Sequence, residues 1–151
     1  MRTVVTFQST AFNTREHKPY FINPSCYGDD LARWLMKRLQ SAGVPTDPEP
    51  GQEDFGWYFT FRPSQTEYQF VIGFRPEESE ASGTWIGWVE RKAGLVASLF
   101  GGRAQGIELE ALSAIHRALG DPDRVSTIKW HDKSDFDAGN EAAGQSQPDV
   151  A

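Results

Sequence analysis

"GQEDFGWYFTFRP", residues 51–63, leads from a segment with glycine and two acids into a ladder of aromatic residues. Every second position of the ladder is aromatic: Phe55, Trp57, Phe59 and Phe61. Side chains of a β-strand alternate between its two faces, so this spacing predicts a strand over residues 55–62 with one buried aromatic face. Tyr58 and Thr60 are expected on the opposite face.

Two more strands are predicted directly after the aromatic ladder. In "EYQFVIGF", residues 67–74, the large apolar side chains again share one face, formed by Tyr68, Phe70, Ile72 and Phe74. In "GTWIGWVER", residues 83–91, Ile86 and Trp88 are expected on one face, and Trp85 and Val89 on the opposite face. The connecting segments are short and turn-like, which predicts a three-stranded antiparallel meander.

The clearest helix signal is "YGDDLARWLMKRLQSAG", residues 27–43. Its apolar residues recur at helical spacing: Leu31, Trp34, Leu35 and Leu39. Asp29 or Asp30 is expected to cap the N-terminus of this helix, where acids also suit the helix dipole. Gly43 and then Pro45 are expected to end it.

The remaining segments predict two further strands, a second helix and a connector. Strands are predicted over residues 2–9 and 125–131, and a second helix over residues 107–120. The proline-rich residues 44–53 are predicted to be a connector without regular structure. The order is βαβββαβ. It predicts an α+β two-layer sandwich, in which two helices cover one face of a mostly antiparallel sheet of four to five strands.

The chain carries its excess of acids at the C-terminus. It has 151 residues and a net charge of -6, which suits one domain, expected over residues 1–131. Residues 132–151 hold one lysine and five acids, and are predicted to be a disordered acidic tail. The rest of the chain is nearly balanced in charge. It therefore lacks the basic excess of a nucleic-acid binder, and no nucleic-acid partner is expected.

The N-terminal segment and the single cysteine indicate where in the cell the protein is expected. Cys26 is the only cysteine, so an intramolecular disulfide is excluded. The N-terminal segment does not resemble a signal peptide, and no window approaches the length of a membrane-spanning helix. We expect a cytoplasmic protein, without a transmembrane segment and without contact to a membrane surface.

The sequence offers little support for catalysis. His17, His116 and His131 show no metal-ligand spacing, so neither a metal nor a cofactor is expected. Cys26 precedes a helix, but a packed thiol explains it better than a nucleophile does. Glu53 and Asp54 form an acidic lip at the start of the aromatic ladder. Adjacent residues of an extended chain point to opposite faces, so these two do not predict a catalytic pair.

Two other features are candidates for binding. Trp85 and Trp88 are three residues apart on one strand, so one of them must leave the helix-covered face. With Tyr58 and Trp130 it could form an outer aromatic patch. The second feature is the apolar "GLVASLF", residues 94–100. Its candidate contact residues, together with a flanking arginine, are Leu95, Leu99, Phe100 and Arg103.

Burial of residues 94–102 as a plug at one end of the sandwich is the default interpretation, and exposure as a partner-binding finger is the alternative. We hypothesise a small non-enzymatic domain that binds a protein partner or a second copy of itself, as an accessory or inhibitor. It would use the outer aromatic face or residues 94–102. The alternative is a small-molecule-binding domain or an unrecognised enzyme, with a Trp-lined pocket between sheet and helices.

Overall fold

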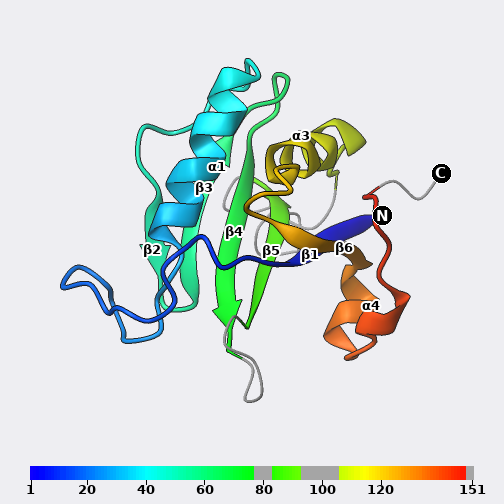
Figure 1. The fold of residues 1–151 in the computed structure, drawn as a ribbon. Coiled ribbons are helices and arrows are strands. Elements are labelled where there is room, and N and C mark those ends of the chain that lie inside the picture. The colour runs from blue at the N-terminus through cyan, green and yellow to red at the C-terminus, as the bar shows by residue number, and fades with distance from the viewer. Residues whose placement is uncertain (77–82, 93–105, 149–151) are drawn as a thin grey trace.

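The computed structural model describes residues 1–76, 83–92 and 106–148 of the chain. In these residues six strands form one antiparallel sheet in the order β2-β3-β4-β5-β1-β6 (Figure 1). The strands are β1 (Arg2–Gln8), β2 (Gly51–Glu53), β3 (Gly56–Phe61), β4 (Tyr68–Arg75), β5 (Thr84–Arg91) and β6 (Ser126–Asp132). The helices are α1 (Asp29–Ser41), α3 (Leu109–Leu119), the short α4 (Lys133–Asp137) and the 3-10 helix η2 (Glu141–Ala143).

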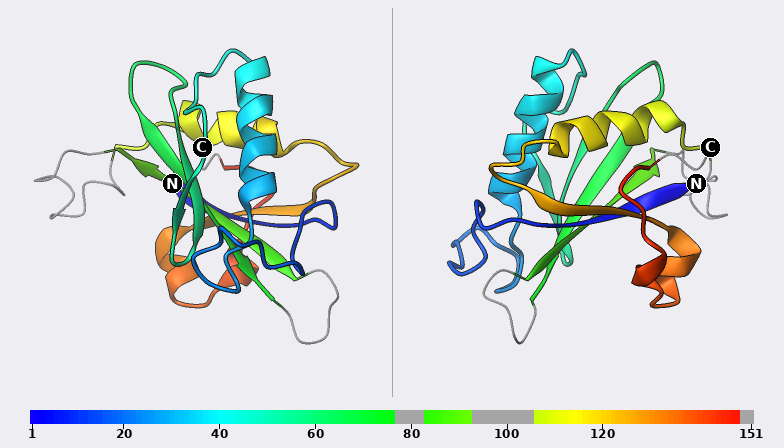
Figure 2. Two further views of the ribbon diagram at one scale, coloured as in Figure 1. Left: turned by 90° about the vertical axis from the view of Figure 1, so that its left-hand side faces the viewer. Right: turned by 45° about the vertical axis from the view of Figure 1, so that its right-hand side comes forward.

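Helices α1 and α3 lie on the same side of the sheet, and α4 lies on the other side (Figure 2). The α+β class and the antiparallel sheet are therefore confirmed. The sheet has six strands rather than the four to five expected from the sequence. The short α4 on the far side is also additional to the predicted arrangement of two helices on one face.

The sixth strand, β2, falls in the proline-rich segment that was predicted to lack regular structure. It pairs with β3 through Gly51 opposite Tyr58 and Glu53 opposite Gly56. Its outer edge is held by the Gln52 amide, which donates to the Tyr20 carbonyl at 2.9 Å. Glycine and acids have poor strand propensity, so this strand exists through its pairing partner and not through its own residues.

The predicted core face of the meander is confirmed except at Phe55, which is exposed. Phe59 and Phe70 are paired across β3 and β4, their ring centroids lie 5.9 Å apart, and both are fully buried. Strand β1 continues this face, because Phe7 pairs with Trp85 of β5. Aromatic cross-strand pairs of this kind stabilise a sheet by up to about 1 kcal/mol each beyond an Ala pair. The face is closed by the buried side of the two main helices.

Gly87 of β5 lies on this aromatic face and makes room for it. A Cβ atom added at Gly87 would lie 2.3 Å from Cζ of Phe70. Real Cβ atoms do not approach this closely, so the Phe70 ring occupies the space that any other residue at position 87 would need. Gly87 is therefore part of the core packing.

Both main helices follow their predicted apolar stripes. In α1, Leu31, Leu35 and Leu39 are buried. The expected cap position is wrong, because Gly28 occupies the N-cap, but the Asp30 carboxylate does accept the backbone N–H of Leu31 in the first turn at 2.9 Å. Asp29 and Asp30 lie in its first turn, and their carboxylates bind the preceding loop. In α3 the buried residues include the three predicted ones, Leu112, Ile115 and Leu119.

The structure differs from the expected disordered tail over residues 132–148. The Asp132 carboxylate accepts hydrogen bonds from the backbone N–H groups of Ser134 and Asp135, and so caps α4. Further on, Gln145 pairs with Trp130 through two backbone hydrogen bonds of 2.6 and 2.8 Å. The acids of this segment therefore cap a helix and pair with cations. Residues 149–151 lie outside the described residues.

We predict that Gly87→Ala destabilises the protein by about 1–3 kcal/mol, the usual cost of overpacking a core. In an ordinary strand interior the same change would stabilise, because glycine there is weaker than alanine. The measurement is the free energy of unfolding in urea. Adding Phe70→Leu provides the control, because the two changes together should cost less than the sum of their separate costs. A stabilising Gly87→Ala would contradict this packing.

Candidate functional site: the outer face of the sheet

The outer face is the side of the sheet that faces away from α1 and α3. Over β1 and β6 it is covered by α4 and η2, and His131 of β6 packs against Phe136 of α4 with ring centroids 5.4 Å apart. Over β3, β5 and most of β4, no helix of the described residues covers it (Figure 2); the exception is the end of β4, where Arg75 binds Glu141 of η2. The outer face is thus half covered and half open in the part of the chain that the structure describes.

The open half carries an aromatic cluster. Strand pairing places Tyr58, Val71 and Trp88 in one row across β3, β4 and β5. The Phe55 ring lies against Trp88, with centroids 5.6 Å apart, and Ile86 lies on the same face. We name Phe55, Tyr58, Ile86 and Trp88 the outer aromatic cluster. Phe55 is 50% exposed, and the other three are half-buried.

Phe55 is the member that sequence reasoning placed wrongly. It was expected on the buried face with Trp57, but it lies in the two-residue turn between β2 and β3. The strand begins at Gly56, where a Cβ would lie only 2.0 Å from the Ile72 carbonyl oxygen. The close approach of two backbones at that glycine sets the start of β3. Phe55 therefore lies outside the alternation and turns toward Trp88.

The outer aromatic cluster is packed rather than loosely scattered. Val71 is on the outer face and yet only 3% exposed, so the side chains around it shield it from water. The Trp88 indole N–H donates to the Glu90 carboxylate at 3.0 Å. A half-buried tryptophan whose indole N–H is hydrogen-bonded is typical of binding surfaces, where one part of the side chain is apolar and the other is in contact with water.

The acidic lip lies at the edge of this cluster. Glu53 ends β2, Asp54 begins the turn, and both are exposed. Their backbone carbonyls accept hydrogen bonds from the Cys26 thiol at 3.4 Å and from the Asn23 amide at 2.7 Å. Neither carboxylate has an ion pair within the described residues. The lip thus adds uncompensated negative charge next to Phe55.

Two of the predicted tryptophans do not belong to this surface. Trp85 and Trp130 are fully buried on the helix-covered face. Trp85 packs 4.9 Å from Phe74, and the Trp130 indole donates to His116 of α3 at 3.0 Å. Trp85 and Trp88 do face opposite sides, as their spacing predicted. The other predicted contact residues lie outside the described residues: Leu95, Leu99, Phe100 and Arg103.

The structure gives Cys26 a packing role. Burial raises the pKa of its thiol, and the negative charges of Asp29 and Asp54 raise it further. A thiol with a raised pKa is a poor nucleophile at neutral pH. Within the described ranges, no group of three or more His, Cys, Asp or Glu residues is placed to hold a metal ion. None of the helices described there is long and apolar enough to cross a membrane.

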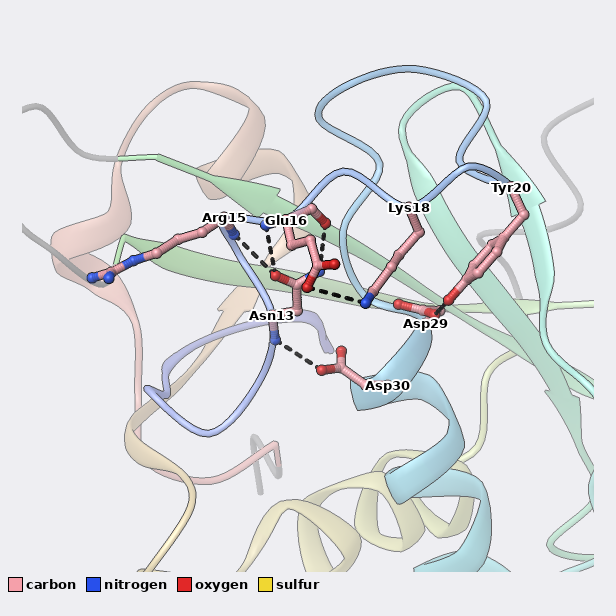
Figure 3. Close-up of polar contacts among 7 residues, drawn as sticks. All are labelled: Asn13, Arg15, Glu16, Lys18, Tyr20, Asp29 and Asp30. Carbon is pink, nitrogen blue, oxygen red and sulfur yellow. Dashed lines mark hydrogen bonds and ion pairs between the residues drawn. The ribbon is translucent and has the colours of Figure 1, made fainter.

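A polar network that sequence reasoning missed surrounds the N-terminus of α1 (Figure 3). The Tyr20 hydroxyl donates to the buried Asp29 carboxylate, and this hydrogen bond raises the pKa of Tyr20 to about 12. Asp30 accepts the backbone N–H of Asn13 at 2.8 Å, and burial raises the pKa of its carboxyl group. The network anchors the long loop before α1, which accounts for both acids structurally.

A second missed feature joins η2 to the sheet. The Arg75 guanidinium makes two hydrogen bonds to the Glu141 carboxylate, of 2.9 and 3.1 Å. Beside this pair His131 is only 1% exposed, and its Nε2 is hydrogen-bonded to the Thr6 hydroxyl at 2.8 Å. Burial lowers the pKa of His131. A cavity of about 240 Å³ lies between these groups and Lys129. The contacts explain why the C-terminal segment stays on the outer face.

Comparisons with known proteins identified no relative of this chain. No protein-family model matches the chain, and no match was found among curated proteins or among solved structures. No family is therefore assigned. The function has to be argued from the residues of the two faces of the sheet.

We predict that His131 makes the protein less stable in acid. Because its pKa is lowered in the folded state, the unfolded chain binds the proton more readily. The stability that neutral His131 contributes is present above its ordinary pKa of about 6.5, and is lost as the pH falls through the lowered folded value. The free energy of unfolding in urea should therefore decrease from about pH 7.5 to about pH 5, a range that spans the ordinary histidine pKa of about 6.5.

The comparison uses the size of this pH-dependent loss, so the general cost of each substitution cancels. His131→Gln should lose less stability on acidification than the wild type. His17→Gln changes a loop histidine and should keep the wild-type loss. An unchanged loss in His131→Gln would show that other groups, such as His116, whose pKa burial also lowers, carry the acid sensitivity.

Proposed function

We propose that this protein is a non-enzymatic binding domain that recognises another protein through the outer aromatic cluster. The observation that carries the proposal is the Phe55–Trp88 ring pair on the half of the sheet that no described helix covers. The covered half of the same face shows the contrast, because α4 packs on it directly through Phe136 and His131.

The energetics of exposed aromatic side chains support a docking role. A large apolar side chain gains about 1.5–3 kcal/mol when it is fully removed from water. Tryptophan, tyrosine and phenylalanine are enriched at protein interfaces, and tryptophan and tyrosine are frequent among the residues that dominate binding energy. Trp88 is half-buried already and has its indole N–H satisfied, so docking on its ring requires little loss of polar contacts.

The charges around the cluster indicate the chemistry of the partner. Glu53 and Asp54 lie beside Phe55, and Glu90 lies beside Trp88. A segment that presents aliphatic or aromatic side chains together with lysine or arginine complements this surface. A symmetric contact between two copies would instead bring two acidic edges into one interface, which is electrostatically unfavourable. The partner is therefore a different protein with a basic, apolar segment.

We predict that peptides selected from a random library for binding to the wild-type protein are rich in apolar and basic residues and depend on Trp88. Trp88→Ser should weaken their binding at least about 30-fold, which corresponds to a dominant interface residue of about 2 kcal/mol. The double change Glu53→Gln, Asp54→Asn should weaken binding less and reduce its sensitivity to salt. Affinities are measured by fluorescence anisotropy of labelled peptides.

Trp34→Ser is the matched control, because Trp34 is also half-buried but lies on α1, on the other side of the sheet. All variants are first checked for wild-type urea unfolding. Peptides that bind Trp88→Ser as tightly as the wild type would overturn the proposal. Sedimentation provides a second check: a wild-type dimer that Trp88→Ser turns into a monomer would make a second copy the occupant, against the proposal.

A further inference from the structure

We propose that the groove between α1 and α3 binds a small organic anion that has an apolar body. The two helices meet on the side of the sheet opposite the outer aromatic cluster, and the C-terminal end of α3 lies beside α1 (Figure 2). A cavity of about 450 Å³ opens between them. Its lining includes Trp34, Lys37, Arg38, Ala114, Arg117 and Ala118.

The charge of this groove stands out in an acidic protein. Lys37, Arg38 and Arg117 all line it, and no acidic residue does. Within the described residues none of the three takes part in an ion pair. The chain as a whole has a net charge of -6, so the positive charge of this groove is opposite in sign to the net charge of the protein. Such a concentration of positive charge favours an anionic ligand.

Helix dipoles do not account for these three cations. Arg38 and Arg117 lie in the last turns of their helices, where cations are favoured. Each helix C-terminus carries the equivalent of about half a negative charge. Two such ends compensate about one of the three positive charges, which leaves about two in the groove. That remainder suits a ligand with one or two negative charges.

The geometry keeps the groove open and gives it an apolar wall. The Arg38 Nε–H donates to the Ala118 carbonyl at 2.6 Å, which fixes the crossing of the helices. Small side chains at Ala114 and Ala118 leave the space between them unfilled. The Arg38 guanidinium lies 5.1 Å from the centre of the half-buried Trp34 ring. Only one of its five N–H groups is used in the bond to Ala118, so others remain for an anion.

These features define the class of ligand. An aromatic or aliphatic body would pack against Trp34 and the two alanines, while a carboxylate or a similar anionic group meets Lys37 and Arg117 at the rim. The volume falls within the range of about 300–1,000 Å³ that small-ligand sites occupy. The sequence hypothesis placed a Trp-lined pocket between the sheet and the helices, whereas this cavity lies between the helices themselves.

The test uses 2-naphthoate as a probe, with neutral 2-naphthamide as its uncharged counterpart. Isothermal titration should show one saturable naphthoate site per chain and at least about tenfold weaker binding of the amide, the difference that one lost charged contact makes. The double variant Lys37→Gln, Arg117→Gln should bind naphthoate at least about tenfold more weakly. Both side chains are exposed, so these changes leave the core intact.

Lys129→Gln is the matched control, because it removes an exposed cation from the opposite side of the sheet and should leave naphthoate affinity unchanged. Trp34→Leu should weaken binding and remove the ligand-induced change in tryptophan fluorescence. Equal binding of naphthoate to the wild type and to the Lys37/Arg117 double variant would overturn the proposal. Loss of binding in Trp88→Ser with retention in Trp34→Leu would also overturn it, because the anion would then lie on the outer face.

Discussion

The structure depends on the pairing of β1 between β5 and β6. This N-terminal strand is the only link between the meander and the C-terminal strand in the described sheet, and Val5 pairs with Gly87 on one side and Trp130 on the other. Because the strand lies between two neighbours and under cover on both faces, Val4 and Val5 are both buried although they point in opposite directions. A strand buried on both faces cannot accept a charged side chain in its interior without a large desolvation penalty. The helices on both sides of the sheet pack over this strand or next to it.

On one side of β1, helices α1 and α3 close the aromatic core. On the other, α4 and η2 cover only the end of the sheet that β1 and β6 form. The Arg75–Glu141 pair and the buried His131 hold this cover in place, but all of them lie toward one end. This short segment reaches the meander only at the end of β4, where Arg75 binds Glu141. The outer aromatic cluster is therefore left where the cover ends, and its partial exposure follows from the topology.

Much of this arrangement could be predicted from local patterns, and the errors in the sheet share one cause. Alternation within a strand correctly placed Trp85 and Trp88 on opposite faces, because that property belongs to a single segment. Trp130 was misplaced because its face is set by pairing with Val5, which is far away in the sequence. Strand β2 was missed for the same reason, since only β3 makes it a strand. The cationic groove requires two helices to cross, and neither helix sequence contains that crossing.

The two candidate surfaces differ in charge as well as in position. The outer aromatic cluster has an acidic edge, whereas the groove between α1 and α3 has a basic one, so the net charge describes neither surface. Between them lies a layer of fully buried side chains, among them Phe59 and Phe70. Coupling between two ligands requires an element with two arrangements that both ligands bias. Because the layer between them is closely packed in the described residues, we expect the two surfaces to bind their ligands independently, so that both can be occupied at the same time.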